Sequence, residues 1–211
     1  MYQWQLFTVD QIGYVALVSG NAFDNTVVEA ARFCYQSKGD NMGPKDRNLL
    51  EKLVKSDPAH NTVFEHCTFQ FEVKCPIFIA RQWMRHRIGT FNEKSLRYTK
   101  TTPEYWVPPH FGLDERKAYN TTIGYCFQLY QDMLIGGVPK EEARAVLPLA
   151  TYTQFLWTVN AWSLMNYLSK RLDNHAQRLH REYANLVFRL FKSDMPLTAK
   201  FFTERNQACT Q

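Results

Sequence analysis

The sequence predicts an α+β protein in which one central sheet is flanked by helices. Residues 66–74 alternate between apolar and polar types, with Cys67, Phe69, Phe71 and Val73 on one side, as in a half-buried strand. Residues 14–19 and 151–159 are further candidate strands, and the second is rich in aromatic and β-branched residues. Candidate helices lie between these strands. At 211 residues and 45% apolar composition, the chain is most simply one domain spanning 1–211.

Four segments are predicted to be helices: residues 25–35, 45–55, 116–135 and 139–146. Gly136 and Gly137 end the third of these, and Pro139 begins the fourth. The proline-rich segment 99–112 is expected to be a loop that borders a site. We expect the C-terminal segment of roughly 15 residues to be peripheral.

A further helix is predicted to start after Pro76, because proline's missing N–H is harmless in a first turn. It is expected to continue without a breaker to Gly89, which would place Gln82, Arg85 and His86 on one face. After Gly89, the chain is expected to form an extended loop or a short strand.

Asn160 is a good N-cap for a helix that follows the strand at 151–159. In projection, its apolar arc holds Ala161, Leu164, Met165, Leu168 and Leu172, and its polar arc holds Asn160, Ser163, Asn166, Tyr167, Lys170 and Arg171. From the residues alone, a solvated surface helix and a helix that borders an anion are equally good interpretations. The next helix is expected to be capped by Asp173 or Asn174. Its predicted core stripe is Ala176, Leu179, Tyr183, Leu186, Val187 and Leu190.

Residues 81–98 carry the strongest functional signal in the chain. They hold four arginines, which are Arg81, Arg85, Arg87 and Arg97. A guanidinium group presents donors in a fixed fork that matches phosphate or carboxylate. One arginine pair would ordinarily be a solvated helix end, whereas this many arginines in so short a stretch indicate a bound anion.

The same segment resembles the signature of the flavin-dependent thymidylate synthases. That signature is Arg-His-Arg, seven residues and a serine, which stand here as Arg85, His86, Arg87 and Ser95. Three more blocks resemble the family in the same order, at residues 62–66, 143–148 and 157–177. Together, the blocks span most of residues 1 to about 195. The resemblance implies the fold of that family.

The resemblance implies reductive methylation of deoxyuridine monophosphate (dUMP) to thymidine monophosphate (dTMP). Methylenetetrahydrofolate is expected to give the carbon unit, and FAD, reduced by NADPH, to give the hydride. The family uses no cysteine nucleophile, and none of the five cysteines has an evident base beside it in the sequence. A cation must then stabilise the charge that develops on the uracil ring. Arg171 matches the position of that catalytic group.

Matching positions give the remaining site residues that the resemblance implies. Flavin-binding residues are expected to be Thr62, Arg85, His86, Arg87, Glu93, Asn160, Ala161, Trp162 and Asn166. The dUMP site is expected to hold Gln82, Arg85, Glu93, Lys94, Ser95, Leu96, Arg97, Arg144 and Arg171. Ser95 is interpreted as a phosphate ligand, because no base is evident for a nucleophile. His60 matches a histidine near the entrance for flavin and folate.

Three positions depart from the usual pattern of the family. Trp162 stands where arginine is common, Lys170 where leucine is usual, and Leu179 where an acidic residue is common. An indole can stack but cannot pair with a phosphate. Contacts to the adenine end of the flavin are therefore expected to differ.

Several properties bear on partners and location. The resemblance implies a homotetramer whose active sites are shared between subunits. The histidines lack the spacing of a zinc site, so we expect no metal. Cysteines 34, 67, 75, 126 and 209 are scattered, without a CxxC motif, and no secretory signal or membrane-length apolar run is evident. We therefore expect a cytoplasmic protein with no membrane partner.

Two other functions remain open. The net charge of +5 suits anionic small molecules, but it would also suit nucleic acid. A nucleic-acid-binding protein would use the same arginines with Phe91, Tyr98 and Trp106 as stacking platforms, and would bind no flavin. A catalytically silent homologue would keep the site residues without turnover. The flavin-dependent synthase, with no nucleic-acid partner, is the expected function.

Overall fold

The computed structural model describes residues 4–56 and 60–208, and its main feature is a five-stranded antiparallel sheet. The strands are β1 (Trp4–Phe7), β2 (Tyr14–Gly20), β3 (Thr68–Pro76), β4 (Thr90–Glu93) and β5 (Tyr152–Asn160). Their order across the sheet is β1-β2-β3-β5-β4, and every neighbouring pair is antiparallel. The predicted α+β class is confirmed, and each of the three predicted strands lies within two residues of its expected bounds.

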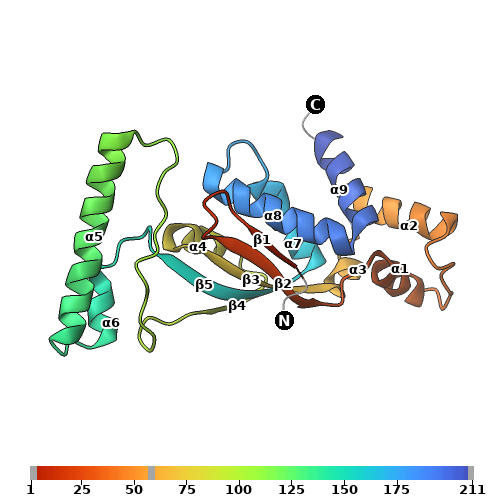
Figure 1. The fold of residues 1–211 in the computed structure, drawn as a ribbon. Coiled ribbons are helices and arrows are strands. Elements are labelled where there is room, and N and C mark those ends of the chain that lie inside the picture. The colour runs from red at the N-terminus through yellow and green to blue at the C-terminus, as the bar shows by residue number, and fades with distance from the viewer. Residues whose placement is uncertain (1–3, 57–59, 209–211) are drawn as a thin grey trace.

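The helices are α1 (Asp24–Phe33), α2 (Pro44–Lys55), α3 (Thr62–Glu65), α4 (Ile77–Trp83), α5 (Leu113–Ile135), α6 (Lys140–Ala143), the 3₁₀ turn η1 (Arg144–Val146), α7 (Ala161–Arg171), α8 (Arg178–Asp194) and α9 (Pro196–Ala208). Figure 1 shows α1, α2, α3 and α9 gathered at one end of the sheet. At the other end, α5 and α6 stand apart from the strands. We call the unit of α5, α6 and η1 the arm.

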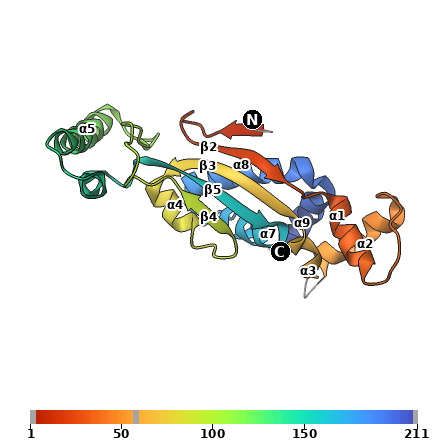
Figure 2. The ribbon, with the colours of Figure 1, turned by 90° about the horizontal axis from the view of Figure 1, so that it is seen from below.

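The central strand β3 explains how the core forms. Phe69, Phe71, Val73 and Cys75 are fully buried against the helices, whereas the residues between them are half-buried. This follows from the period of two that the sequence displays, because alternate side chains in a strand point to opposite faces. Figure 2 looks onto the second face, with α7 and α8 behind the strands. The buried face therefore meets the helices that carry several predicted site residues.

Helix α4 is shorter than predicted, since it ends at Trp83 and not at Gly89. The N–H groups of Arg85 and His86 bond to carbonyls three residues back, at 3.4 and 3.0 Å, which tightens the chain into a turn. The chain must then straighten, because Thr90 starts β4 and pairs with Thr158. The expected short strand after Gly89 is confirmed, but the shared helical face of Gln82, Arg85 and His86 is wrong.

Gly89 itself allows this change of direction. A Cβ atom there would lie 2.8 Å from the indole nitrogen of Trp157 and 3.1 Å from the carbonyl oxygen of Thr158. Only glycine leaves room for the close approach of this turn to β5. The backbone that carries Arg85, His86 and Arg87 is thus packed directly against the sheet.

The helices α7 and α8 also depart from prediction. Ser163 and Tyr167 were expected on a polar face of α7, but both are buried. Tyr167 lies between α4 and the sheet, where its ring stacks on Trp83 with centroids 5.0 Å apart. The predicted caps of α8 are wrong: the helix starts later, at Arg178, and Asp173 instead accepts a turn hydrogen bond of 2.7 Å from the His175 N–H. The predicted core stripe of α8 is buried from Leu179 onward.

Helix α9 contributes to the same core through Ala199, Phe201 and Phe202. Its first turn is bonded to buried Asp24 of α1, whose carboxylate accepts from the Leu197 N–H at 2.8 Å and the Thr198 N–H at 2.9 Å. The Thr198 hydroxyl donates to the same carboxylate at 2.6 Å. One acidic side chain thus caps a helix that lies far away in the sequence.

Candidate functional site

The last residue of α7 and the turn after α4 meet at Arg171. Its Nε donates to Nε2 of His86 at 3.0 Å, and its Nη2 donates to the carbonyl oxygen of Gln82 at 3.3 Å. The structure therefore brings together His86, which the sequence analysis assigned to the flavin, and two residues that it assigned to the dUMP site, Gln82 and Arg171. We call Gln82, His86 and Arg171 the helix-end cluster.

The side chain of Gln82 is held on both sides of its amide. Its Nε2 donates to Oε1 of Gln177 at 2.6 Å, and its Oε1 lies 3.5 Å from Nδ1 of His180. His180 is buried and stacks on Trp83, with ring centroids 5.3 Å apart. Sequence reasoning gave His180 no role, because a histidine on a helix carries no signal of what it packs against.

Both histidines of this region are neutral at ordinary pH. Burial lowers the pKa of His86 to about 4, and the nearby charges of Arg171 and Lys170 act in the same direction. Burial likewise lowers the pKa of His180 to about 3, with Arg171 and His86 as further causes. A neutral His86 can accept the Arg171 N–H through Nε2.

The charge of Arg171 is consequently not neutralised. Its two partners are an imidazole and a backbone carbonyl, and no carboxylate in the described part of the chain forms an ion pair with it. Arg85 and Arg87, on the turn beside it, are exposed and also lack a described carboxylate partner. The arrangement can hold an anion, or stabilise negative charge that develops on a bound ring.

The chain after β4 forms a compact turn beside the arm. The Ser95 carbonyl oxygen accepts from the N–H groups of Tyr98 at 3.1 Å and Thr99 at 3.0 Å, while its Oγ accepts from the Arg97 N–H at 3.3 Å. Nζ of Lys140 on α6 donates to the Tyr98 carbonyl oxygen at 2.8 Å. The backbone of this turn is therefore bonded to the arm at Tyr98.

Arg144 belongs to the same side of the molecule. It starts η1 in the arm, is exposed, and donates through Nε to the Glu141 carbonyl oxygen at 3.2 Å. We call Lys94, Ser95, Leu96, Arg97 and Arg144 the arm-side cluster. Among the described residues, no hydrogen bond or ion pair joins the arm-side cluster to the helix-end cluster. The residues predicted for the nucleotide thus form two groups that are not bonded to each other in the described part of the chain.

Glu93 lies at the end of β4, between these two groups in the sequence. Its Oε1 accepts from the Thr153 hydroxyl at 2.6 Å, so one carboxylate oxygen is held by the neighbouring strand. The residue is nevertheless exposed. Within residues 4–56 and 60–208 its second oxygen has no hydrogen-bond donor, so it can contact a ligand.

The remaining residues assigned to the flavin lie around α3 and on α7. The predicted cap at Asn160 is confirmed, because its Oδ1 accepts from the Ser163 N–H at 2.8 Å. Buried Ala161 donates its N–H to the Cys67 carbonyl oxygen at 2.8 Å, which joins α7 to the segment after α3. Thr62, His60 and Asn166 are exposed, whereas Trp162 is half-buried and packs against the core.

The buried cysteines are poor nucleophiles. Burial raises the pKa of Cys67 to about 11, and burial also raises the pKa of Cys75 well above its usual value. Cys209 lies outside the described residues. Among residues 4–56 and 60–208, no group of three metal-ligating side chains lies together, and no helix is long and apolar enough to cross a membrane.

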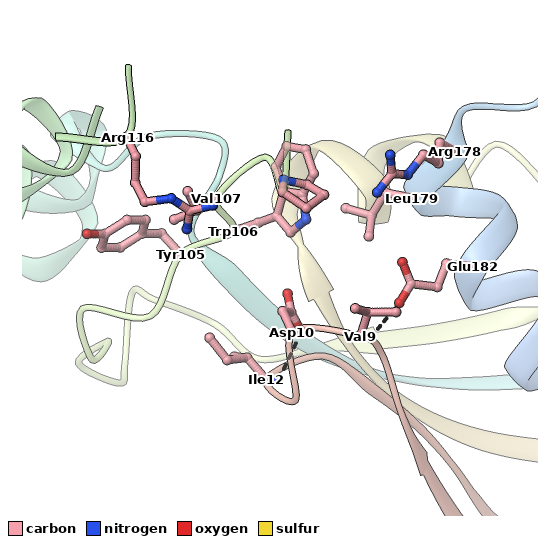
Figure 3. Close-up of a pocket in the computed structure, with 11 residues that line it drawn as sticks. Val9, Asp10, Ile12, Tyr105, Trp106, Val107, Arg116, Arg178, Leu179 and Glu182 are labelled. Atoms are coloured by element: carbon pink, nitrogen blue, oxygen red, sulfur yellow. Dashed lines mark hydrogen bonds between the residues drawn. The ribbon is translucent and has the colours of Figure 1, made fainter. Parts of the chain in front are cut away.

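A separate cavity of about 390 Å³ lies beside segment 105–109. The loop at 99–112 was expected to border a site, and it forms one wall of this cavity. The other walls are the β1–β2 turn, the first turn of α5 and the start of α8, as Figure 3 shows. None of the predicted site residues lines it. Sequence reasoning missed it because its residues come from four distant segments.

Comparisons with known proteins find matches that cover most of the chain. The family model described as "Thymidylate synthase complementing protein" matches residues 16–197. The flavin-dependent thymidylate synthase of Thermosipho africanus (strain TCF52B) is 42% identical over 209 residues, which cover 90% of each chain. The flavin-dependent thymidylate synthase of Thermotoga neapolitana is 42% identical over 198 residues, again 90% of each chain. The crystal structure of the UMP/dUMP methylase PolB from Streptomyces cacaoi, bound with 5-Br dUMP, superposes with a TM-score of 0.83 at 30% identity, over 91% of this chain and 95% of that one.

Proposed function

Because the chain belongs to the flavin-dependent thymidylate synthase family, we propose that it methylates dUMP to dTMP by reduction with a flavin. FAD, reduced by NADPH, supplies the hydride when it is bound, and methylenetetrahydrofolate is the carbon donor. A uracil nucleotide as substrate is supported by a solved relative, which is named as a UMP/dUMP methylase and holds 5-Br dUMP. We also propose that residues 1–211 act as one catalytic domain in the cytoplasm.

The uncompensated charge of Arg171 is the observation that carries the proposal. Methyl transfer to C5 of uracil requires that negative charge be stabilised elsewhere on the ring. The buried thiols are not suited to push electrons into the ring, since the pKa values of Cys67 and Cys75 are raised. A guanidinium held by neutral His86 keeps its full charge for the uracil. Gln82, fixed by Gln177, is available to orient the base.

The exposed arginines fit the phosphates of the two nucleotides. Arg85 and Arg87 flank His86, which contacts Arg171, and both are exposed without an ion-pair partner among the described residues, so their guanidinium groups suit the pyrophosphate of FAD and the phosphate of dUMP. We assign the flavin to Thr62, Arg85, His86, Arg87, Glu93, Asn160, Ala161, Trp162 and Asn166, with His60 at the entrance. Because buried Ala161 has its N–H bonded to Cys67, its assignment rests on its position only.

The nucleotide site is assigned to both clusters, and we propose that two subunits complete it. Arg144 and the turn at 94–97 are tied to the arm, whereas Arg171 lies on the helix side of the sheet. A partner subunit could supply one cluster to the other. Exposed apolar side chains on α5, such as Tyr125 at 72% and Ile135 at 85%, favour burial of the arm against another copy. We therefore propose a homotetramer with shared active sites.

A visible absorption spectrum of the purified protein, incubated with FAD and desalted, tests the proposal first. We expect retained flavin whose spectrum shifts on addition of dUMP, followed by dTMP formation when methylenetetrahydrofolate and NADPH are added. Retained flavin without dTMP would indicate a catalytically silent homologue. Absence of flavin, together with salt-dependent binding to long DNA or RNA, would replace the proposal with nucleic-acid binding.

A further inference from the structure

The cavity beside segment 105–109 is lined by residues that have no role in the proposed reaction. Its wall carries two arginines, Arg116 from α5 and Arg178 from α8, with Trp106 between them (Figure 3). Asp10, on the β1–β2 turn, lies across the cavity from Trp106, whereas Glu182 lies one helical turn after Arg178 on α8 and is drawn below it in the same view. We call these five residues the arginine pocket.

The two carboxylates of the arginine pocket are committed to the fold. Asp10 accepts from the Thr8 hydroxyl at 2.7 Å and from the N–H groups of Ile12 and Gly13 at 3.0 and 3.1 Å. Burial raises the pKa of Asp10, but these bonds and one from Tyr152 outweigh it and hold the pKa below its usual value. Glu182 accepts from the Val9 N–H. These bonds fix the β1–β2 turn against α8.

The two guanidinium groups, by contrast, have no such role. Arg116 is half-buried and Arg178 is exposed, and among the residues that the structure describes neither forms an ion pair or a side-chain hydrogen bond. Each points its head group toward the cavity from a different helix. The cavity thus holds two arginines and two carboxylates, and Arg116 and Arg178 are the groups that the acidic part of a ligand would contact.

Trp106 is a rigid aromatic wall between the two arginines. Its backbone N–H donates to the Ala150 carbonyl oxygen at 3.0 Å, and its backbone carbonyl oxygen accepts from the Tyr119 hydroxyl at 3.0 Å. Phe78 of α4 supports the indole edge to face, with centroids 5.5 Å apart. A planar ring could stack on this indole without reorganising the backbone.

The arginine pocket leads toward the helix-end cluster. A smaller cavity of about 110 Å³ shares Trp106, Arg178 and Glu182 with it and adds Gln177. Gln177 accepts the hydrogen bond from Gln82. A ligand seated on Trp106 would therefore have its other end one side chain away from Gln82.

We propose that the arginine pocket binds the distal end of a co-substrate, namely a planar ring that carries acidic groups. The ring stacks on Trp106, and the acidic groups pair with Arg116 and Arg178. This inference rests on the proposed function, because two of its co-substrates have such an end. They are the benzoylglutamate tail of the folate and the adenosine 2′-phosphate end of NADPH.

Calorimetric binding of two fragments to the full-length protein tests the inference. The probes are 4-aminobenzoyl-L-glutamate and adenosine 2′,5′-bisphosphate. Arg116→Ala and Arg178→Ala should each weaken binding of the fragment that binds by about tenfold, which is about 1.4 kcal/mol, because each substitution removes a charge-assisted hydrogen bond. Arg189→Ala removes an exposed arginine of α8 outside the pocket and should leave binding unchanged.

The two fragments distinguish the sources of the ligand. Binding of the benzoylglutamate alone assigns the pocket to the folate, and binding of the bisphosphate alone assigns it to NADPH. In turnover, the same two variants should raise KM for that co-substrate and leave kcat unchanged. If neither fragment binds, or if neither substitution changes the affinity of the fragment that binds, the inference is overturned.

Failure of this inference is distinguishable from failure of the proposed function. Fragment binding requires neither flavin nor turnover. Conversely, the Arg116→Ala and Arg178→Ala proteins should retain FAD and show the same spectral shift with dUMP as the unsubstituted protein, because neither residue belongs to the flavin or nucleotide site. Normal flavin and dUMP behaviour with no fragment binding rejects the pocket alone.

Discussion

Arg171 illustrates how neighbouring residues set the chemistry of a single side chain. A carboxylate partner would hold the guanidinium equally well but would cancel its charge. Here the partners are a neutral imidazole and a carbonyl oxygen, so the position is fixed and the charge is kept. In turn, His86 is harder to protonate, because burial and the adjacent cations lower its pKa to about 4.

Arg171→Ala should abolish dTMP formation, with a loss of at least about 100-fold, because the cation that stabilises the uracil charge is removed. The same substitution should raise the pKa of His86 part of the way from about 4 toward its ordinary value, since burial remains. An NMR titration of the imidazole measures the second effect independently of activity. Circular dichroism should report an intact fold.

Arg171→Lys is the matched control, because it keeps the positive charge but loses the planar arrangement of donors in the guanidinium group. It should hold the pKa of His86 low and retain part of the activity. Normal turnover in the alanine variant would reject uracil activation by Arg171. An unchanged His86 pKa would reject the electrostatic contact.

His180 makes the stability of the protein depend on pH. Its pKa is about 3 in the folded state, below the ordinary value of 6.5, so the unfolded chain binds the proton more strongly. The stabilising contribution is therefore fully present above pH 6.5 and is lost as the pH falls toward 3. His86 acts in the same direction, over the window from 6.5 to about 4.

His180→Phe should flatten this dependence while keeping a ring stacked on Trp83. Between pH 6.5 and 4.5, the unsubstituted protein should lose about 2 kcal/mol more unfolding free energy than the variant, from a slope of about 1.4 kcal/mol per pH unit. Urea unfolding at both pH values measures it. Parallel pH profiles of the two proteins would show that His180 does not titrate as described.

At the scale of elements, the regular patterns were predictable and the junctions were not. Alternation in 66–74 predicted β3 correctly, because a strand with one face on the core leaves that pattern in the sequence. The predicted end of α4 was wrong. The chain must leave the helix early so that Thr90 can pair with Thr158, and this contact is remote in sequence. Tyr167 was placed on the polar face for the same reason: its stacking partner Trp83 is invisible to a helical projection.

Asp24 provides a test of one such remote contact. Asp24→Ala should destabilise the protein by about 2 kcal/mol, since it removes the acceptor of three donors in the first turn of α9, two of which are buried. Asp24→Asn keeps one acceptor oxygen and should lose less. Thermal or urea unfolding measures both, with exposed Glu29→Ala as the matched control on α1. Equal stability of all three variants would mean that α9 does not depend on this cap.

At the scale of the whole molecule, the candidate site is distributed. The sequence resemblance predicted its residues without indicating that they form two groups in one chain that are not bonded to each other. The structure assigns Gln82, His86 and Arg171 to the helix side of the sheet and Arg144 to the arm. Sequence order could not reveal this, because Arg144 and Arg171 lie only one strand and one helix apart along the chain.

If two subunits complete each site, defects in the two clusters should complement each other. Arg144→Ala and Arg171→Ala should each inactivate the protein when expressed alone. When the two are co-expressed, about a quarter of the sites in randomly mixed oligomers would combine an intact arm-side cluster from one chain with an intact helix-end cluster from another. Turnover of dUMP should therefore recover to about that fraction of the unsubstituted activity.

Co-expression of Arg171→Ala with a chain that carries both substitutions is the control and should recover nothing. If the pair of single variants also stays inactive while forming mixed oligomers, both clusters must act within one subunit, and the arm would then have to fold back onto α7 when the nucleotide binds.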